Sequence, residues 1–111
     1  MTIETNSFIF GRAKNPWNQD RTTGGSSGGE AGLIALGGSL VGLGNDIGGS
    51  IRIPSSYCGI YGYKPSTKRI FPKGLSSLAQ SFDGNKNITV GSGPMARSVN
   101  DLVSLMTVLL N

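Results

Sequence analysis

Two glycine-rich segments of this chain each present serine in a setting suited to nucleophilic chemistry. The first is the stretch 24–30, Gly-Gly-Ser-Ser-Gly-Gly-Glu, and the second is the stretch 44–52, Gly-Asn-Asp-Ile-Gly-Gly-Ser-Ile-Arg. Glycine lacks a Cβ, so such a loop lets the backbone approach a reacting group and aim several N–H donors at one point. A single serine of this kind is most often a helix cap or a turn residue. The two loops together, with Ser26 and Ser50 twenty-four residues apart, suggest a serine-based site.

A serine nucleophile needs a base, and this sequence contains no histidine. The pattern Gly24-x-Ser26-x-Gly28 matches the nucleophile elbow of α/β-hydrolases, but that arrangement depends on a histidine to accept the serine proton. Lysine is the alternative base if burial or a neighbouring cation lowers its pKa from about 10.4 toward neutrality. No lysine lies three residues after a serine, so the Ser-x-x-Lys arrangement is also absent. The lysines are Lys14, Lys64, Lys68, Lys73 and Lys86.

Glycine-rich loops also bind phosphate, but the fingerprints for this fail here. Gly42-x-Gly44 is followed by Ile47, where a dinucleotide-binding motif requires its third glycine, and the first loop continues with Glu30 instead of Gly-Lys-Ser/Thr. An anion or nucleotide binder therefore remains the weakest interpretation. Cys58 is the only cysteine, which excludes a disulfide scaffold and, without histidine, the usual zinc sites. We expect no metal and no cofactor, and we expect Cys58 to be a buried small residue.

The two serine loops, in this order and at this spacing, resemble the amidase signature family, whose members hydrolyse carboxamides with a Ser-Ser-Lys triad. The segment 59–65, Gly-Ile-Tyr-Gly-Tyr-Lys-Pro, also follows the family pattern after the second loop. The signature region covers residues 22–65. Asn15-Pro16-Trp17 together with the stretch 50–54 is most similar to the fatty-acid amide hydrolase branch. The resemblance implies an α/β fold, part of the mixed-sheet α/β/α amidase core, with 1–111 as a partial domain and no complete second domain.

The resemblance also implies the role of each site residue. Ser50 is the acylated nucleophile, Ser26 is the bridging serine that relays its proton to the lysine, and Ser27 supports the relay. The peptide bond between Gly25 and Ser26 is cis in the family. Asp46 and Arg52 orient the nucleophile loop. The oxyanion hole is formed by the backbone N–H groups of Ile47, Gly48, Gly49 and Ser50.

Two features depart from the family pattern. Asn45 stands where a threonine or serine usually precedes the aspartate. The catalytic lysine of the family lies several tens of residues upstream of the first loop, a segment that this sequence lacks, and Lys14 stands in the wrong context for that role. We therefore expect these 111 residues alone to have no amidase activity and to require the upstream part of the same domain.

The elements that position the first loop are predicted from local patterns. Ser27 and Glu30 fit a capping box, which predicts a helix from Gly28 through Leu36 that ends at the following glycines, 37 and 38. Ser26 would then lie just before a helix N-terminus, where the helix dipole favours developing negative charge.

The second loop is predicted to follow a buried strand at 40–44, which delivers Asn45 and Asp46. Pro54 predicts the first turn of a short helix that reaches Cys58, and 59–63 predicts another strand. Residues 66–97 are predicted to be irregular, with weak strand signals at 70–71 and 88–90.

A last helix is predicted to start at Ser98 with Asp101 three residues later. Its apolar stripe suggests packing against protein outside this stretch. The stripe consists of Val99, Leu102, Val103, Met106, Leu109 and Leu110.

Composition limits the function further. The chain has 111 residues, room for no more than one small domain, and a net charge of +4. Its one basic concentration, 64–73, lacks interleaved aromatic residues, so we expect no nucleic-acid partner. No stretch has the roughly twenty apolar residues of a membrane span, and no signal peptide is evident, which favours an intracellular location without assigning a compartment. Membrane association of the full protein has no support in this stretch.

Two interpretations of the function lead. The first is a piece of an amidase that cleaves linear amides, with fatty-acid amides favoured, through a serine acyl-enzyme. Its partner would be a small-molecule amide substrate. The alternative is a non-catalytic, amidase-derived binding or interaction chain. Trp17 and the tyrosines are expected to pack against protein and not to contact an acyl chain.

Overall fold

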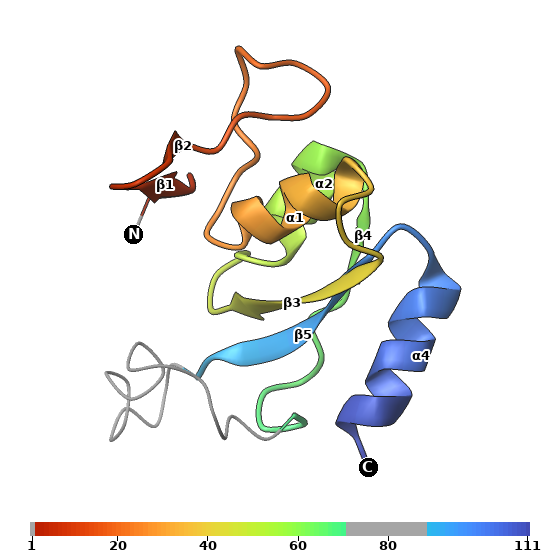
Figure 1. Ribbon diagram of the computed structural model, residues 1–111. Helices are drawn as coiled ribbons and strands as arrows, with labels where there is room; N and C mark the ends of the chain where they lie inside the picture. The colour runs from red at the N-terminus through yellow and green to blue at the C-terminus, as the bar shows by residue number, and fades with distance from the viewer. Residues whose placement is uncertain (1, 71–88) are drawn as a thin grey trace.

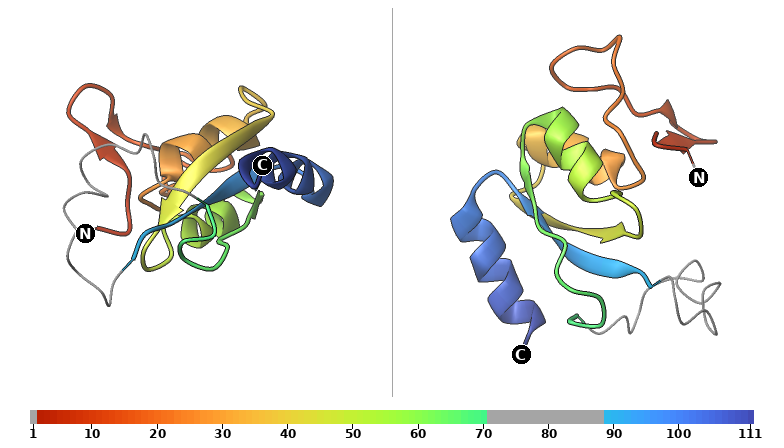
Figure 2. Two further views of the ribbon diagram at one scale, coloured as in Figure 1. Left: turned by 90° about the horizontal axis from the view of Figure 1, so that it is seen from below. Right: turned by 180° about the vertical axis from the view of Figure 1, so that it is seen from behind.

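A computed structural model of the chain describes residues 2–70 and 89–111. Its centre is a three-stranded antiparallel sheet in the order β3-β5-β4. Two helices, α1 and α2, cover one face of the sheet, and α4 lies on the other side (Figures 1 and 2). The fold class is thus α/β, as predicted. The elements are β1 (Asn6–Ser7), β2 (Gly11–Arg12), α1 (Gly28–Ala35), β3 (Val41–Asp46), α2 (Arg52–Cys58), β4 (Tyr61–Gly62), β5 (Gly91–Ala96) and α4 (Val99–Leu109).

The hydrophobic core lies between the sheet and the pair α1 and α2. Ile34 of α1, Ile51 just before α2 and Met95 of β5 are fully buried and belong to one cluster. Cys58 belongs to the same cluster, which confirms the prediction that it is a buried small residue. Burial raises the pKa of the Cys58 thiol, so the thiolate is disfavoured.

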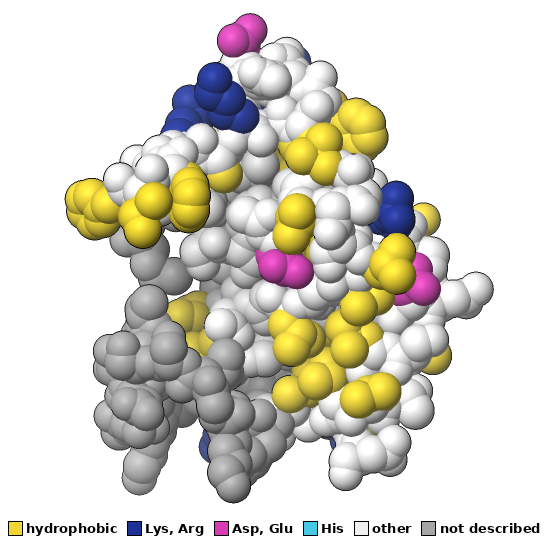
Figure 3. Space-filling view, in the orientation of Figure 1, with side chains coloured by type: hydrophobic (Ala, Val, Ile, Leu, Met, Phe, Trp, Pro, Cys, Tyr) yellow, Lys and Arg dark blue, Asp and Glu magenta, His cyan; other side chains and the backbone are white. Residues whose placement is uncertain are grey.

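The predicted strand at 40–44 forms as β3, but the prediction that it is buried is wrong for one of its faces. Leu43 is 53% exposed, whereas Gly44 and Asp46 are buried. Successive side chains of a strand point to opposite faces. The face toward α1 and α2 is covered, whereas Val41 and Leu43 belong to the apolar side chains left exposed. Figure 3 shows apolar side chains gathered on one side of the described surface.

Strand β5 lies in a stretch for which irregular structure was predicted. Its sequence, Gly-Ser-Gly-Pro-Met-Ala, is poor in strand-forming residues, yet it is the central strand of the sheet. The carbonyl of Pro94 accepts a hydrogen bond from the N–H of Tyr63. Since N and O of an antiparallel residue face the same neighbour, position 94 faces the Tyr63 backbone just past the end of β4, and proline forms only the carbonyl bond of this pair. A Cβ on Gly93 would collide with the Tyr63 carbonyl oxygen, so this position requires glycine.

The other predicted elements differ in detail. Helix α2 starts at Arg52, two residues before Pro54, and the predicted strand at 59–63 is shorter as β4. The weak strand signals at 70–71 and 88–90 lie partly outside the described residues. Their described members, Ile70, Thr89 and Val90, belong to no strand.

Helix α4 begins as its sequence predicts. The hydroxyl of Ser98 accepts a hydrogen bond from the N–H of Asp101 and donates one to its carboxylate. Of the apolar stripe only Leu102 is buried within the described structure; Val99 and Val103 are 54% and 59% exposed. That protein outside this stretch covers the apolar stripe stays a prediction.

The segment Asn15-Pro16-Trp17 anchors the C-terminal end of α2. The last carbonyls of a helix have no partner within the helix. Here the side-chain amide of Asn15 donates to the carbonyl of Tyr57 at 2.8 Å, and the indole N–H of Trp17 donates to the carbonyl of Cys58 at 2.7 Å. Trp17 is 70% exposed, so its described contribution is this hydrogen bond more than packing.

Replacing Trp17 with phenylalanine removes the indole donor and leaves the Cys58 carbonyl without it. We expect the free energy of unfolding to fall by about 1 kcal/mol. Urea denaturation followed by far-ultraviolet circular dichroism would measure the change. Tyr61→Phe is the control, because no hydrogen bond of the Tyr61 hydroxyl occurs in the described part of the chain. Equal effects of the two substitutions would contradict the anchoring role.

Candidate active site

The first serine loop turns sharply ahead of α1. Gly24 has a left-handed backbone with φ of +76°, and the Gly25–Ser26 peptide bond is cis, as the resemblance implied. The segment that precedes the hairpin β1-β2 lies against this loop, because a Cβ on Gly25 would be 2.6 Å from the backbone of Glu4. The turn leaves the Ser26 side chain exposed at the surface.

The prediction of a capping box at the start of α1 is wrong. Ser27 occupies the N-cap position but makes no side-chain capping bond. Its hydroxyl instead accepts a hydrogen bond from the N–H of Asn45, at 3.2 Å, at the end of β3. The Glu30 side chain lies against Gly42 of β3, where a Cβ would collide with it. Both side chains therefore connect α1 to the sheet.

The two serine loops are joined directly through their backbones. The N–H of Ser27 donates to the carbonyl of Ser50 at 3.1 Å. Together with the bond between Ser27 and Asn45, this contact holds the first loop against both ends of the segment 45–50. The structure thus brings Ser26, Ser27 and Ser50 into one region, although their loops are far apart in the sequence.

Asp46 is the organising residue of the second loop. Its carboxylate is 1% exposed and accepts hydrogen bonds from the N–H groups of Gly49 at 2.6 Å, Ile51 at 3.1 Å and Arg52 at 3.3 Å. The Arg52 guanidinium adds two bonds, Nε to Oδ2 and Nη2 to Oδ1, each 3.0 Å. Such a bidentate pair fixes orientation as well as charge. Asp46 and Arg52 therefore hold the turn that carries Ser50.

These hydrogen bonds determine the charge state of Asp46. Burial alone raises the pKa of this carboxyl, but the bonds from Arg52 and the three backbone N–H groups outweigh it and hold the pKa well below its ordinary value. The unfolded chain titrates at about pH 4 at this position. A depressed folded-state pKa contributes stability above the unfolded pKa, and that stability is lost as the pH falls through the folded-state value.

We therefore expect the free energy of unfolding to decrease as the pH is lowered below about 4, in part because Asp46 becomes protonated. The Asp46→Asn variant should lack this component and show a shallower decrease. Denaturant midpoints measured between about pH 6 and pH 2 would show the difference. Parallel pH profiles for the two proteins would contradict the assignment.

Some backbone N–H groups of the second loop already donate a hydrogen bond within the structure, and others do not. The N–H of Gly49 already donates to Asp46, so it is not free to face a reacting oxygen. In the described part of the chain, the N–H groups of Ile47, Gly48 and Ser50 make no hydrogen bond. Of the four N–H groups predicted to form an oxyanion hole, that of Gly49 thus has another acceptor in this structure.

The serine hydroxyls are not connected to one another in this structure. Ser50 is 9% exposed. Within residues 2–70 and 89–111, no hydrogen bond joins the Ser26 and Ser50 hydroxyls, and no lysine donates to either serine. Lys14 pairs through its backbone with Thr22, and the Lys64 ammonium donates to the carbonyl of Pro65. Lys73 and Lys86 lie outside the described residues.

Three residues that the sequence did not single out contribute to the site. Thr5 bonds to the first loop through its hydroxyl. The Ile53 side chain contacts both loops, because a Cβ on Gly24 or on Gly49 would be 3.0 or 2.7 Å from it. The Ser92 hydroxyl donates to the side-chain oxygen of Asn45 at 2.9 Å. Thr5 and Ser92 belong to no local motif, so no sequence signal pointed to them. Ile53 belongs to the stretch 50–54 on which the resemblance rests, but the resemblance assigned it no contact with the two loops.

An open hollow of about 660 Å³ lies between the segment 12–22 and α2, and no serine of the two loops lines it. No group of three potential metal ligands occurs in the described residues. In the same part of the chain, no helix combines the length and the apolar character of a membrane span.

The fold is α/β, and it joins the two serine-bearing loops through their backbones. The family model described as Amidase matches residues 1–111, and the chain belongs to the amidase family. Fatty-acid amide hydrolase 1 of Sus scrofa is 50% identical over 102 residues, which are 92% of this chain and 17% of that protein. Amidase 1 of Gibberella moniliformis is 46% identical over 99 residues, which are 89% of this chain and 18% of that protein.

Solved structures agree with this assignment. A fatty acid amide hydrolase matches with a TM-score of 0.86 at 39% identity, over 100% of this chain and 19% of that chain. A crystal structure of an amidase matches with a TM-score of 0.85 at 39% identity, over 99% of this chain and 24% of that chain. The chain therefore spans about a fifth of the length of these relatives.

Proposed function

We propose that this chain is the serine-bearing part of an amidase domain, with its signature region at 22–65, and that the complete protein hydrolyses an amide through a serine acyl-enzyme. The observation that carries the proposal is the direct contact between the two serine loops, the Ser27 N–H to the Ser50 carbonyl at 3.1 Å. Two loops that only capped neighbouring helices would not need this contact. Ser26 precedes α1, and Ser50 lies between β3 and α2, so these elements hold both serines in one region.

In the proposed mechanism Ser50 attacks the amide carbonyl. Its hydroxyl proton passes through Ser26 to a lysine and then to the leaving amine, so that an acyl-serine and a free amine result. Ser27 keeps the two loops in register through its bonds to Ser50 and Asn45. Water then attacks the acyl-serine and releases the acid.

The oxyanion of the tetrahedral intermediate would be stabilised by the second loop. The N–H groups of Ile47, Gly48 and Ser50 are the donors for which the described residues offer no other acceptor, while that of Gly49 holds the loop to Asp46. Donors fixed in advance stabilise developing charge more than mobile water does, and loss of one typically costs about two to three decades in rate. Asp46 and Arg52 would keep the donors in place.

The lysine is proposed to come from an upstream part of the same domain. The chain covers only about a fifth of the length of its relatives, so most of their sequence has no counterpart here. Among substrates, the similarity to fatty-acid amide hydrolase 1 favours fatty-acid amides over other linear amides. The partner would then be a small amide, and no cofactor is required.

Capture of the acyl group by hydroxylamine tests this proposal. An acyl-serine transfers its acyl group to hydroxylamine, which yields a hydroxamate and restores the serine. With the complete protein and an oleamide substrate, we expect hydroxamate in proportion to added hydroxylamine, and none with residues 1–111 alone. Absence of hydrolysis and of hydroxamate with several amides in a folded complete protein would favour the non-catalytic alternative.

A further inference from the structure

Thr5, on the segment that leads into the hairpin β1-β2, contacts the first serine loop at three points. Its hydroxyl accepts a hydrogen bond from the N–H of Gly28 at 3.0 Å and lies 3.1 Å from the carbonyl oxygens of Gly24 and Ser26. A hydroxyl has one proton and two lone pairs, so it donates to one carbonyl at a time and accepts the Gly28 N–H throughout. These contacts join Thr5 to the first glycine of the loop, to Ser26 and to the first residue of α1.

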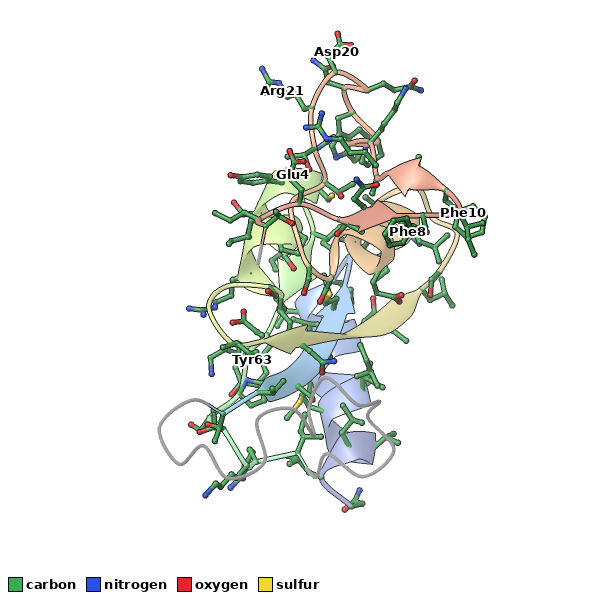
Figure 4. All side chains as sticks on the ribbon, turned by 90° about the vertical axis from the view of Figure 1, so that its left-hand side faces the viewer. Glu4, Phe8, Phe10, Asp20, Arg21 and Tyr63 are labelled. Carbon is green, nitrogen blue, oxygen red and sulfur yellow. The ribbon has the colours of Figure 1, made fainter. Side chains whose placement is uncertain are left out.

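The hairpin holds Thr5 in this place. The carbonyl of Thr5 accepts a hydrogen bond from the N–H of Ala13 at 2.9 Å, and Arg12 forms an ion pair with Glu4 at 2.8 Å. Figure 4 shows Phe8 and Phe10 at the turn of the hairpin, pointing away from the sheet, while Glu4 lies at its other end. The end of the hairpin that carries Thr5 is thus the end that meets the loop.

Thr5 supplies a hydrogen-bond acceptor at the start of α1, where Ser27 makes no side-chain capping bond. An N-cap side chain normally satisfies one of the first free N–H groups of a helix. Here Thr5 satisfies the Gly28 N–H from twenty-three positions upstream, and the Ser27 hydroxyl accepts from Asn45. Position 28 requires glycine, because a Cβ there would be 2.5 Å from the Thr5 hydroxyl oxygen.

From these contacts we infer that Thr5 is a positioning residue for the reaction. Its hydroxyl fixes the main chain on both sides of Ser26, so that the proton relay faces Ser50. The inference rests on the proposed function, since it assigns Thr5 a part in the acylation of Ser50. Thr5 itself touches no reacting atom.

The test compares Thr5→Val, which keeps the shape and removes the hydroxyl, with Thr5→Ser, which keeps the hydroxyl. In the complete protein we expect Thr5→Val to slow the reaction of Ser50 with a fluorophosphonate, and kcat for an amide, by about tenfold, with KM unchanged. Thr5→Ser should remain within about twofold of the wild type. Thr107→Val is the matched control, because within the described residues that hydroxyl bonds only to the carbonyl of Val103 in α4.

Hydrogen exchange at the Gly28 amide gives a second readout that does not depend on catalysis. We expect Thr5→Val to exchange this amide faster than the wild type and Thr5→Ser to restore its protection. The positioning role alone would be overturned if Thr5→Val reacted with the fluorophosphonate at the wild-type rate, or if Thr5→Ser failed to restore the rate and the protection of the Gly28 amide. No reaction of the wild-type protein at Ser50 would instead overturn the proposed function together with it.

Discussion

Replacing Ser50 with alanine in the complete protein is expected to lower kcat for amide hydrolysis at least about a thousandfold, because it removes the hydroxyl proposed to form the acyl-enzyme. Ser50 is nearly buried, and its carbonyl receives the bond from Ser27 that joins the two loops. Alanine keeps that backbone contact. We therefore expect KM and the thermal stability to remain close to those of the wild type.

The matched control for this variant is Ser56→Ala. Ser56 is an exposed serine of α2, only six positions further along the chain. Its loss should leave kcat within about twofold. Steady-state kinetics of both variants, with circular dichroism to establish that they are folded, would measure the contrast. An active Ser50→Ala protein would show that another group is the nucleophile.

Replacing Asp46 with asparagine is expected to give the largest loss of stability. The carboxylate accepts five hydrogen bonds, three from backbone N–H groups and two from Arg52. An asparagine amide would turn its NH₂ group toward donors, leaving buried N–H groups unsatisfied. We expect a loss of about 2–4 kcal/mol in the free energy of unfolding. The rate of Ser50 labelling should fall as well, because the N–H donors of the loop lose their anchor.

Asp20→Asn is the control for the charge change alone. Asp20 is exposed at the tip of the segment 12–22, where Figure 4 shows it pointing into solvent. Surface substitutions of this kind usually stay within about 0.5 kcal/mol. Urea denaturation of both variants at neutral pH would give the two values. A loss of stability no larger for Asp46→Asn than for Asp20→Asn would contradict the organising role of Asp46.

Local patterns were sufficient to predict several parts of the fold. The predicted helix from Gly28 ends at Ala35 as α1, and the predicted start of α4 has the Ser98 cap. The charges at Asp46 and Arg52 were expected to orient the second loop, and they form its ion pair. For the start of α4 and for the ion pair, residues within a few positions supply the interaction, so that the local sequence contains the necessary information, whereas the capping box predicted for α1 does not form.

The features that sequence patterns missed depend on contacts between distant segments. Strand β5 requires glycine at 93 because of the neighbouring Tyr63 backbone, which no local pattern describes. Ser27 fitted a capping box, but Thr5 supplies the cap and Ser27 bonds to Asn45 instead. The Gly49 N–H was counted among the oxyanion donors, yet the carboxylate three positions earlier takes it. Only the three-dimensional arrangement decides between such competing partners.

The most direct test of the account is the reaction of Ser50 with a fluorophosphonate, followed by mass spectrometry of the labelled peptide. Three proteins should be compared: residues 1–111, a form extended upstream through a lysine-bearing segment, and the extended form with Ser50→Ala. We predict labelling of the extended form only, at Ser50. Labelling of residues 1–111 at Ser50 would contradict the need for an upstream lysine, and an unlabelled but folded extended form would contradict the proposal that this is part of a serine amidase.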